Sequence, residues 1–255
     1  MSHGSFVWYE LMTTDAAAAE PFYRGVIGWS ARDAGYPGMP YTLFSVGEAQ
    51  VAGMMTLPKE ARDAGAGPGW MGYVAVDDVD ADAARVAKAG GTVHRAPADI
   101  PGVGRFAVVS DPQQAVFVLF KGLPGMSAPP APANMPGYPG WRELYAVDGA
   151  AAFEFYSGLL GWTKADAMDM GPMGVYQMFA VGGETIGGMI TKPPNIPAPF
   201  WTYYFQVEGI AAAAARIKTG GGTVINGPMQ VPGGSWILQA LDPQGALFAL
   251  VSPNA

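Results

Sequence analysis

The sequence predicts an α+β protein in which two domains of the same type follow one another along the chain. The first observation is an internal repeat, because the segment Phe22–Trp29 returns in similar form as Phe155–Trp162. The second is that each half shows a strand and helix pattern twice, so each domain is a pair of βαβββ units. A repeat of this length is too long for a solenoid and marks two whole domains.

Shorter motifs support the same alignment of the two halves. They are the pairs Trp8-x-Glu10-Leu11 and Trp141-x-Glu143-Leu144, Tyr41-x-x-Phe44-x-Val46 and Tyr176-x-x-Phe179-x-Val181, Gly91-Thr92-Val93 and Gly222-Thr223-Val224, and Asp111-Pro112-Gln113 and Asp242-Pro243-Gln244. We therefore expect the two halves to have the same fold.

The first unit of the N-terminal half begins with a strand. The residues at 6–12 are typical of a strand, and Asp15 is placed to cap a helix that ends near Gly28. Two further strands are predicted over 41–46 and 50–56.

The second unit of this half repeats the order. A strand is predicted over 70–76, and a helix from about residue 79 to 89 ends before Gly90-Gly91. Strands over 105–110 and 115–120 complete the domain. The C-terminal half follows the same plan, so the chain holds four such units.

A proline-rich stretch separates the two halves. Residues 123–140 carry six prolines and almost no charge, which favours an extended, semi-rigid connection. We therefore predict an N-terminal domain over 1–122, a linker over 123–140 and a C-terminal domain over 141–255. Domains of this size can each bury a core.

The composition limits the partners and the chemistry. The net charge is -7 and there is no basic run, which argues against binding to nucleic acid or to anionic membrane surfaces. No apolar stretch is long enough for a membrane helix, and residues 1–4 lead directly into a strand pattern, so we expect a cytoplasmic protein. The absence of cysteine removes disulfides and thiolate chemistry. A small molecule remains as the expected partner.

The repeated motifs resemble one known family. A strand followed by Asp and a helix ending in Phe-Tyr-x-x-x-x-Gly-Trp, the segment Val76–Ala81, and the terminal Asp-Pro-Gln are similar to the glyoxalase, bleomycin-resistance and extradiol-dioxygenase group, the vicinal oxygen chelate superfamily. The resemblance covers most of both halves, and the run Val231–Trp236 points to two-domain, glyoxalase-like bacterial members. It implies that each domain is a cup-shaped, half-open β-barrel around a small ligand, and it leaves the reaction open.

The same resemblance raises the question of a metal. Catalytic members usually bind a divalent ion through His or Glu on the first strand, His or Gln on the strand that opens the second unit, and Glu near the end of the last strand. Those positions hold Trp8, Met71 and Val118 in one half, and Trp141, Thr202 and Ala249 in the other. These side chains are poor ligands for a hard divalent ion, so we expect no cofactor. A modified divalent-metal site built on Glu10 or Glu143 is the alternative.

The candidate catalytic residues are Glu10 and Glu143. Residues two apart in a strand share a face, so Trp8, Glu10 and Met12 lie on one side of the first strand. A carboxylate among Trp and Met loses hydration, which suits a general base or proton donor near neutral pH. The competing interpretation is structural, because such a carboxylate can also accept hydrogen bonds from backbone amides, an indole or an Arg and so fix strand packing.

Aromatic, Met and Arg side chains are the candidate ligand-binding residues. They are Trp8, Met12, Trp70, Tyr73 and Arg105 in the first half, and Trp141, Tyr204 and Trp236 in the second. Aromatic rings would flank a flat or short carbonyl compound, and Tyr hydroxyls would orient it. Arg105 could pair with an acidic group of the ligand, whereas its counterpart Trp236 could not. A place in the hydrophobic core is the alternative role for these aromatic residues.

Two functions follow from these residues. The first is an enzyme that acts on a small carbonyl or aromatic compound, glyoxalase-like or hydroxylase-like by resemblance, with Glu10 or Glu143 as general base. The second is a non-catalytic protein that sequesters a small compound, as bleomycin-resistance relatives do, and a scaffold with closed pockets is a third. The tandem copy allows a monomer, and a homodimer is the alternative.

Overall fold

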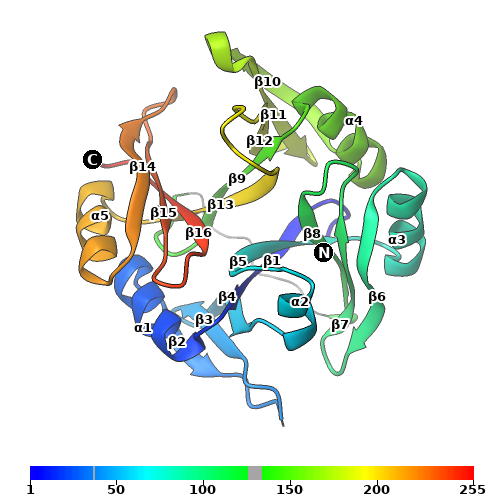
Figure 1. Ribbon diagram of the computed structural model, residues 1–255, viewed down its shortest axis with the longest axis horizontal. Coiled ribbons are helices and arrows are strands. Elements are labelled where there is room, and N and C mark those ends of the chain that lie inside the picture. Colours follow the sequence, from blue (N-terminus) through cyan, green and yellow to red (C-terminus); the bar gives the residue numbers. More distant parts are fainter. Residues whose placement is uncertain (37, 126–133) are drawn as a thin grey trace. The chain divides into compact units, whose positions relative to one another are not determined.

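The computed structural model describes residues 1–36, 38–125 and 134–255 (Figure 1). The elements of the N-terminal half are β1 (Phe6–Thr13), α1 (Ala16–Ile27), β2 (Ser30–Asp33), β3 (Thr42–Val46), β4 (Ala49–Thr56), α2 (Lys59–Asp63), β5 (Gly69–Ala75), α3 (Val79–Lys88), β6 (Thr92–Ile100), β7 (Gly104–Ser110) and β8 (Val116–Gly122). Those of the C-terminal half are β9 (Pro139–Ala146), α4 (Gly149–Leu160), β10 (Thr163–Asp169), the short 3-10 helix η1 (Gly171–Met173), β11 (Val175–Val181), β12 (Glu184–Thr191), β13 (Phe200–Gln206), α5 (Ile210–Thr219), β14 (Thr223–Gln230), β15 (Trp236–Leu241) and β16 (Leu247–Ser252).

Each half of the chain supplies one eight-stranded mixed sheet. The strand orders are β2-β3-β4-β1-β5-β8-β7-β6 and β10-β11-β12-β9-β13-β16-β15-β14, so the second sheet repeats the first. In both sheets the first strand of a unit is parallel to the last strand of the same unit, as in β1 with β4 and β5 with β8. Because each order begins and ends with an unpaired edge, neither sheet closes into a barrel. The predicted α+β class, with four βαβββ units and half-open sheets, is confirmed.

The sequence pattern did not locate every element. The edge strands β2 and β6 carry mostly exposed or half-exposed residues and lack the apolar alternation of a strand with one buried face. The helix α2 is short and buries no residue. His94 lies in the edge strand β6, and its Nε2 is 2.9 Å from Ser110 Oγ. Near the first residue of the chain, His3 Nε2 is 3.3 Å from the Leu159 carbonyl oxygen.

The chain forms two compact units, and each unit combines parts of both halves. One takes its described residues from Met1–Val7, Met71–Ala128 and Arg142–Thr202, and the other from Trp8–Trp70, Pro129–Trp141 and Tyr203–Ala255. In the first unit α3 packs on α4, and in the second α1 packs on α5. The domain limits 1–122 and 141–255 therefore remain a prediction, and the predicted linker falls partly on residues 126–133, which lie outside the described residues.

Repeated motifs explain how each unit is held together. In the second unit, Trp70 Nε1 donates a hydrogen bond to the Tyr23 hydroxyl at 3.0 Å, and this hydroxyl donates to Asp242 Oδ2 at 2.9 Å. The first unit has the equivalent chain from Trp201 to Tyr156 at 3.0 Å and on to Asp111 at 3.1 Å. In both chains the Tyr comes from one half of the sequence and the Asp from the other.

Burial changes the acidity of these groups. Loss of hydration raises the pKa of Asp242, and hydrogen bonds from the Ala246 amide and the Tyr23 hydroxyl offset part of this increase. Burial raises the pKa of Asp111 in the same way. Burial also raises the pKa of Tyr23 well above its usual value, with the charge of Asp242 as the next cause. Tyr23 therefore stays a hydrogen-bond donor at neutral pH.

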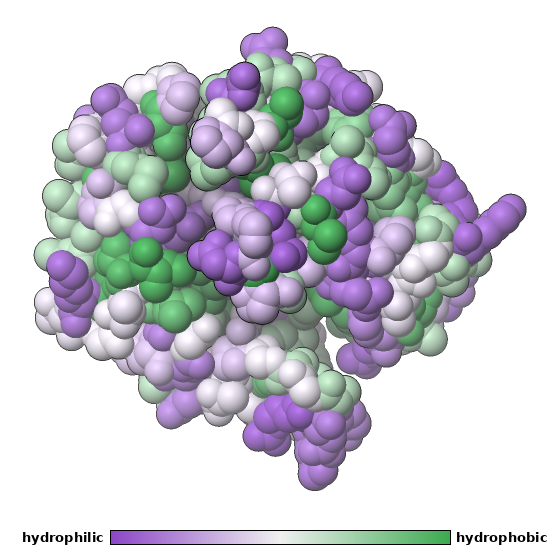
Figure 2. Space-filling model, turned by 45° about the horizontal axis from the view of Figure 1, so that its top comes forward, coloured by the Kyte–Doolittle hydropathy of each residue, from purple (hydrophilic) through white to green (hydrophobic). Residues whose placement is uncertain are grey.

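The surface mixes apolar and polar side chains. On the face shown in Figure 2, hydrophilic residues are interspersed with small hydrophobic areas. Large apolar side chains that are exposed include Val147, Val175 and Ile225. Of the helices in the described ranges, none combines the length and the apolar character that crossing a membrane requires.

Candidate functional site

Glu10 is the centre of a hydrogen-bonded group on β1. Its side chain is 4% exposed, and the Tyr41 hydroxyl donates to Glu10 Oε1 at 2.8 Å. The Trp8 indole Nε1 in turn donates to the Tyr41 hydroxyl at 2.9 Å. The structure thus links two predicted site residues, Trp8 and Glu10, through a third residue that the sequence had not identified as part of a site.

The period of two along β1 determines which face carries Glu10. Tyr9 and Leu11 are buried on the opposite face, where the Tyr9 ring lies edge-on against the ring of Tyr203 at 5.3 Å. Trp8, Glu10 and Met12 therefore share the face that points away from this aromatic core.

A glycine makes room for the Tyr41 hydroxyl. Gly53 on β4 is the register partner of Glu10, and a Cβ at Gly53 would overlap the hydroxyl and ring of Tyr41. A side chain here would push Tyr41 away from the carboxylate. The sequence contains a signal for this arrangement, because Tyr41 and Gly53 return as Tyr176 and Gly188, but the signal has meaning only when the register of β1, β3 and β4 is known.

The neighbours of Glu10 on this face are only partly buried. Trp8 and Met12 lie on β1, Leu43 lies on β3 and Met55 lies on β4, while Tyr41 comes directly before β3. The β1–β4 sheet face thus has a buried carboxylate surrounded by apolar and aromatic side chains that solvent reaches. Such a surface suits a small organic compound.

The hydroxyl beside Glu10 is held in its protonated form. Burial raises the pKa of Tyr41 far above its usual value, and the charge of Glu10 raises it further. The hydrogen bond from Trp8 acts in the opposite direction and is weaker. Tyr41 therefore donates to Glu10 over the whole physiological pH range.

The equivalent face in the C-terminal half carries Glu143 on β9. Glu143 is 8% exposed and is the register partner of Gly188, and a Cβ at Gly188 would overlap the ring and hydroxyl of Tyr176. Tyr176 is itself only 7% exposed. Tyr145, two residues after Glu143, stacks on Phe200 with ring centroids 4.9 Å apart. This face therefore has the same Glu, Tyr and Gly positions but a more aromatic and more buried surrounding.

Three other predicted ligand-binding aromatics lie in buried positions. Trp70 is 7% exposed and bonded to Tyr23, and its ring contacts Phe205 at 4.9 Å. Tyr73 is 6% exposed and lies edge-on to Phe120. Tyr204 is 2% exposed, and its hydroxyl accepts a hydrogen bond from Gln239 Nε2 at 2.9 Å.

The remaining two aromatic candidates are more accessible. Trp141 on β9 and Trp236 on β15 are both half-buried. A role in ligand binding stays a prediction for all five of these aromatic residues.

Arg105 has acidic partners within the chain. Its guanidinium donates to both carboxylate oxygens of Asp80, at 2.6 and 2.8 Å, and to Asp99 at 2.9 Å. The hydrogen bond from Arg105 lowers the pKa of Asp80, and the two aspartates raise the pKa of Arg105. Its predicted role toward an acidic ligand remains untested.

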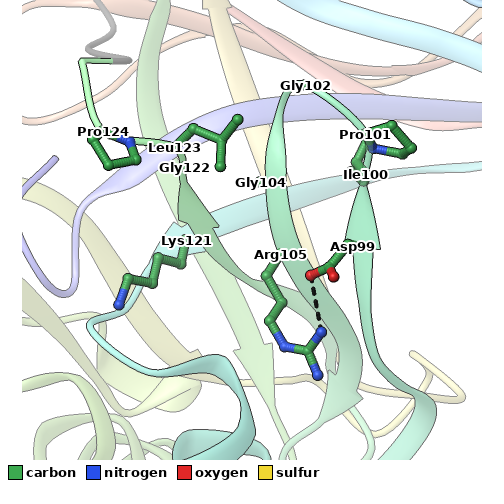
Figure 3. Close-up of a pocket in the computed structure, with 10 residues that line it drawn as sticks. All are labelled: Asp99, Ile100, Pro101, Gly102, Gly104, Arg105, Lys121, Gly122, Leu123 and Pro124. Atoms are coloured by element: carbon green, nitrogen blue, oxygen red, sulfur yellow. Dashed lines mark hydrogen bonds and ion pairs between the residues drawn. The ribbon is translucent and has the colours of Figure 1, made fainter.

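Arg105 also lines an open pocket at the β6–β7 turn (Figure 3). The cavity volume is about 380 Å³, and Lys121 from β8 is the register partner of Arg105 at its wall. Ile100, Pro101 and Leu123 form an apolar part of this wall. The two cations and Asp99 leave the pocket without a strong excess of either charge.

The metal positions implied by the family resemblance do not fit a divalent ion. Trp8 uses its indole N–H as a donor, and Val118 and Ala249 are fully buried alkyl groups. Across the described ranges, no three His, Cys, Asp or Glu side chains are grouped so that they could hold a metal ion.

The amino-acid sequence matches one family model and is similar to proteins of known sequence. The model of the Glyoxalase/Bleomycin resistance protein/Dioxygenase superfamily matches residues 5–119 and again 139–250. The provisionally named glyoxylase CFP32 of Mycobacterium tuberculosis (strain CDC 1551 / Oshkosh) is 32% identical over 96% of this chain and 94% of its own length. The anthracycline biosynthesis protein DnrV of Streptomyces peucetius is 34% identical over 97% of this chain and 93% of its own.

Solved structures show the same fold at low sequence identity. The Mn(II)-bound glyoxalase from Novosphingobium aromaticivorans has a TM-score of 0.67 at 17% identity, covering 100% of this chain and 84% of the other. The 2,2',3-trihydroxybiphenyl 1,2-dioxygenase from Sphingomonas wittichii strain RW1 has a TM-score of 0.68 at 15% identity, covering 98% and 91%.

Proposed function

Because this chain belongs to the Glyoxalase/Bleomycin resistance protein/Dioxygenase superfamily, we propose that it is an enzyme that moves a proton on a small carbonyl compound, with Glu10 as the proton acceptor. One observation carries the proposal. Glu10 is a buried carboxylate on a sheet face whose other side chains are apolar and partly open to solvent. A carboxylate with little hydration, next to a surface that can hold an organic molecule, meets the requirements of a general base.

Each residue of the group has a defined part in this proposal. Glu10 takes a proton from the carbon next to the carbonyl, and the C–H electron pair forms the enolate. The Tyr41 hydroxyl orients the carboxylate through its 2.8 Å hydrogen bond, and Trp8 orients Tyr41. Glu10 then returns the proton to the substrate, so neither an oxidant nor a reductant is consumed.

The relatives support the substrate class in a general way. One is named as a glyoxylase and another as an anthracycline biosynthesis protein, so both names refer to small organic compounds. The substitution of Phe200 for its N-terminal counterpart Gly69 favours the N-terminal face for turnover, because the C-terminal face carries an added aromatic stack.

A binding protein without turnover is the second candidate. The hydrogen bonds from Trp8 to Tyr41 and on to Glu10 would also hold the carboxylate as a fixed recognition group. A ligand that neutralised or hydrogen-bonded Glu10 would then be retained and not converted.

A comparison of carboxamide variants tests the proposal. Methylglyoxal, with and without glutathione, is given to the wild type, Glu10→Gln and Glu143→Gln, and aldehyde loss is followed together with deuterium uptake from D₂O. We expect Glu10→Gln to lower kcat by about 100-fold or more, the usual effect of removing a general base. Glu143→Gln is the matched control and should retain most of the activity.

The possible results separate the two candidates. Turnover that survives Glu10→Gln contradicts the assignment of the base. A rise in the melting temperature with methylglyoxal, without product or deuterium uptake, supports the binding protein instead. Loss of activity in both variants would assign the chemistry to both faces.

A further inference from the structure

The pocket at the β6–β7 turn is built from one short part of the chain. Its lining residues all lie between Asp99 and Pro124, within one of the two compact units. Three of them are Gly102, Gly104 and Gly122, which add no side chain to fill the hollow. A volume of about 380 Å³ is enough for a small organic molecule. The pocket is therefore a candidate ligand site that shares no residue with the site proposed on β1.

Arg105 at the wall of the pocket is already bonded within the chain. Its guanidinium donates two hydrogen bonds to Asp80, one to Asp99 and one to the Pro97 carbonyl oxygen. A guanidinium has five N–H groups, so only one is left for a ligand. The hydrogen bond from Arg105 also lowers the pKa of Asp80, which keeps this carboxylate charged at neutral pH. The two aspartates therefore offset the positive charge of Arg105.

Lys121 is the cation of this pocket that has no acidic partner. It is the register partner of Arg105, and residues directly opposite in antiparallel strands share one face of the sheet. Lys121 is exposed, and its ammonium group forms no ion pair or hydrogen bond with the part of the chain that the structure describes. Figure 3 shows Asp99 turned toward Arg105, with the Lys121 ammonium group apart from both. Lys121 is thus free to bind an anion.

The pocket also has an apolar part. Leu123 comes two residues after Lys121 and is 46% exposed, and its amide donates to the Val103 carbonyl oxygen at 3.0 Å. Ile100 and Pro101 line the pocket from the other side of the turn. Covering these side chains with an apolar group would remove their surface from water, which favours binding.

The C-terminal half does not repeat the two cations. The positions equivalent to Arg105 and Lys121 hold Trp236 and Ser252, which are also register partners. Ser252 is fully buried, and its hydroxyl donates to the Glu208 carbonyl oxygen at 3.1 Å. The shared fold therefore does not require a cation at either position, and the pair is a feature of the N-terminal half.

We propose that this pocket binds a small carboxylic acid with an apolar body. The carboxylate accepts hydrogen bonds from the Lys121 ammonium group. The apolar body covers Ile100, Pro101 and Leu123. A dianion such as inorganic phosphate fits less well, because only one positive charge is not offset and the carboxylate of Asp99 lies in the same wall. This binding does not depend on the proton transfer proposed on β1.

A titration followed at isoleucine methyl groups tests the site directly. Protein labelled with ¹³C at the isoleucine δ-methyl carbons is titrated with 3-phenylpropanoate, and each signal is assigned as the one missing from the Val variant at that position. We expect the Ile100 signal to shift saturably, while that of Ile225, an exposed isoleucine on β14, stays in place. The neutral 3-phenylpropanamide has the same apolar body and should bind about tenfold more weakly, as expected for loss of a charged hydrogen bond.

Substitution of the lysine gives a second readout. Lys121→Met keeps an apolar stem and removes the charge, so it should weaken binding of 3-phenylpropanoate about tenfold and leave that of 3-phenylpropanamide nearly unchanged. Lys88→Met, at an exposed lysine of α3 outside the pocket, is the matched control and should change neither affinity. Because both lysines are exposed, both variants should keep a melting temperature close to that of the wild type.

Three results would overturn the proposal. They are equal affinities for 3-phenylpropanoate and its amide, equal affinities of the wild type and Lys121→Met for 3-phenylpropanoate, and an Ile100 signal that does not shift. Displacement of 3-phenylpropanoate by an equal concentration of inorganic phosphate would show a site for any anion, which also contradicts it. Glu10→Gln should leave the titration unchanged, and this result separates the pocket from the proposed activity.

Discussion

The Glu10 face and the Glu143 face start from one plan and differ in what surrounds the acid. Both have a buried glutamate opposite a glycine that makes room for a tyrosine. Around Glu10 the tyrosine is half-buried, whereas the equivalent Tyr176 is 7% exposed. The glutamate, tyrosine and glycine are thus a shared framework, and the surrounding residues distinguish the two faces.

This difference separates inherited structure from specialisation. A position that is the same in both faces can be explained by the fold, so Glu10 and Glu143 alone do not identify a function. The positions that differ carry more information, and Phe200 in place of Gly69 is one of them. Paired substitutions at shared and at divergent positions can therefore test the contrast between the two faces.

The largest effect on stability is expected when a methyl group is added at the glycine opposite each glutamate. Gly188→Ala would force a methyl group into the buried Tyr176, and we expect a loss of about 3 kcal/mol in the free energy of unfolding. Gly53→Ala meets the half-buried Tyr41, which can move outward, so the expected loss is about 1 kcal/mol. Urea unfolding of both variants measures the difference.

A strand glycine with open space provides the control. A Cβ at Gly69 on β5 would have no neighbour within 4 Å, so Gly69→Ala should change stability little. Equal losses for Gly188→Ala and Gly53→Ala would show that the two tyrosines are equally confined, and the contrast between the faces would then fail.

The next largest effect is expected in the core, where each unit has a hydrogen-bonded chain from Trp to Tyr to Asp. Tyr23→Phe and Tyr156→Phe each remove a hydrogen bond to a buried aspartate, and each should cost about 2 kcal/mol. The two losses should agree, because the chains from Trp to Tyr to Asp have nearly the same distances. Tyr36→Phe, at a half-buried ring outside this chain, is the control and should cost less than about 0.5 kcal/mol. A large difference between the two core variants would mean that the units have diverged internally as well.

Much of the fold follows from the sequence because its signals are local. The strand pattern of residues 6–12 and the Asp15 cap of α1 both depend on a few neighbouring residues, and both β1 and the cap are observed. The edge strands β2 and β6 were missed because an exposed strand has no buried face to impose a pattern. Which units pack together was also not predictable, since a repeat shows that two halves are alike but not which helices meet.

The site shows the same limit. The face shared by Trp8 and Glu10 follows from the period of two, but the role of Tyr41 depends on the register that sets Gly53 opposite Glu10. The pairing of Arg105 with Asp80 joins residues of different elements and left no trace in the sequence pattern. Local periodicity thus predicts which face a side chain occupies, and the contacts across strands decide what it does there.

A smaller effect is expected where the repeat has lost a contact. Gln113 bonds both the amide and the carbonyl of Asp148, at 2.7 and 2.8 Å, whereas the Oε1 of its counterpart Gln244 is buried without a partner. Gln113→Ala should therefore cost about 1 kcal/mol, and Gln244→Ala about zero. Thermal unfolding of the two variants is the measurement, and a larger cost for Gln244→Ala would contradict it.

The smallest difference between the two units is expected in how the two buried aspartates make stability depend on pH. Because burial raises the pKa of both Asp111 and Asp242 in the folded state, each holds its proton more tightly when the chain is folded. The stability that each contributes is present below the ordinary aspartate pKa of about 4 and is lost as pH rises through the raised value. The variants Asp111→Asn and Asp242→Asn cannot titrate there, so their stability relative to the wild type should increase across this window.

Chemical denaturation at several pH values between about 3 and 7 measures that increase for each variant. Both aspartates lose hydration and accept bonds from one tyrosine and from the backbone of the same type of turn, so the two increases should be equal. Equal increases would mean that divergence has been confined to the ligand-facing side of the sheets. Stability differences that do not vary with pH would contradict the raised pKa values, and unequal ones would show that the supporting cores had diverged together with the faces.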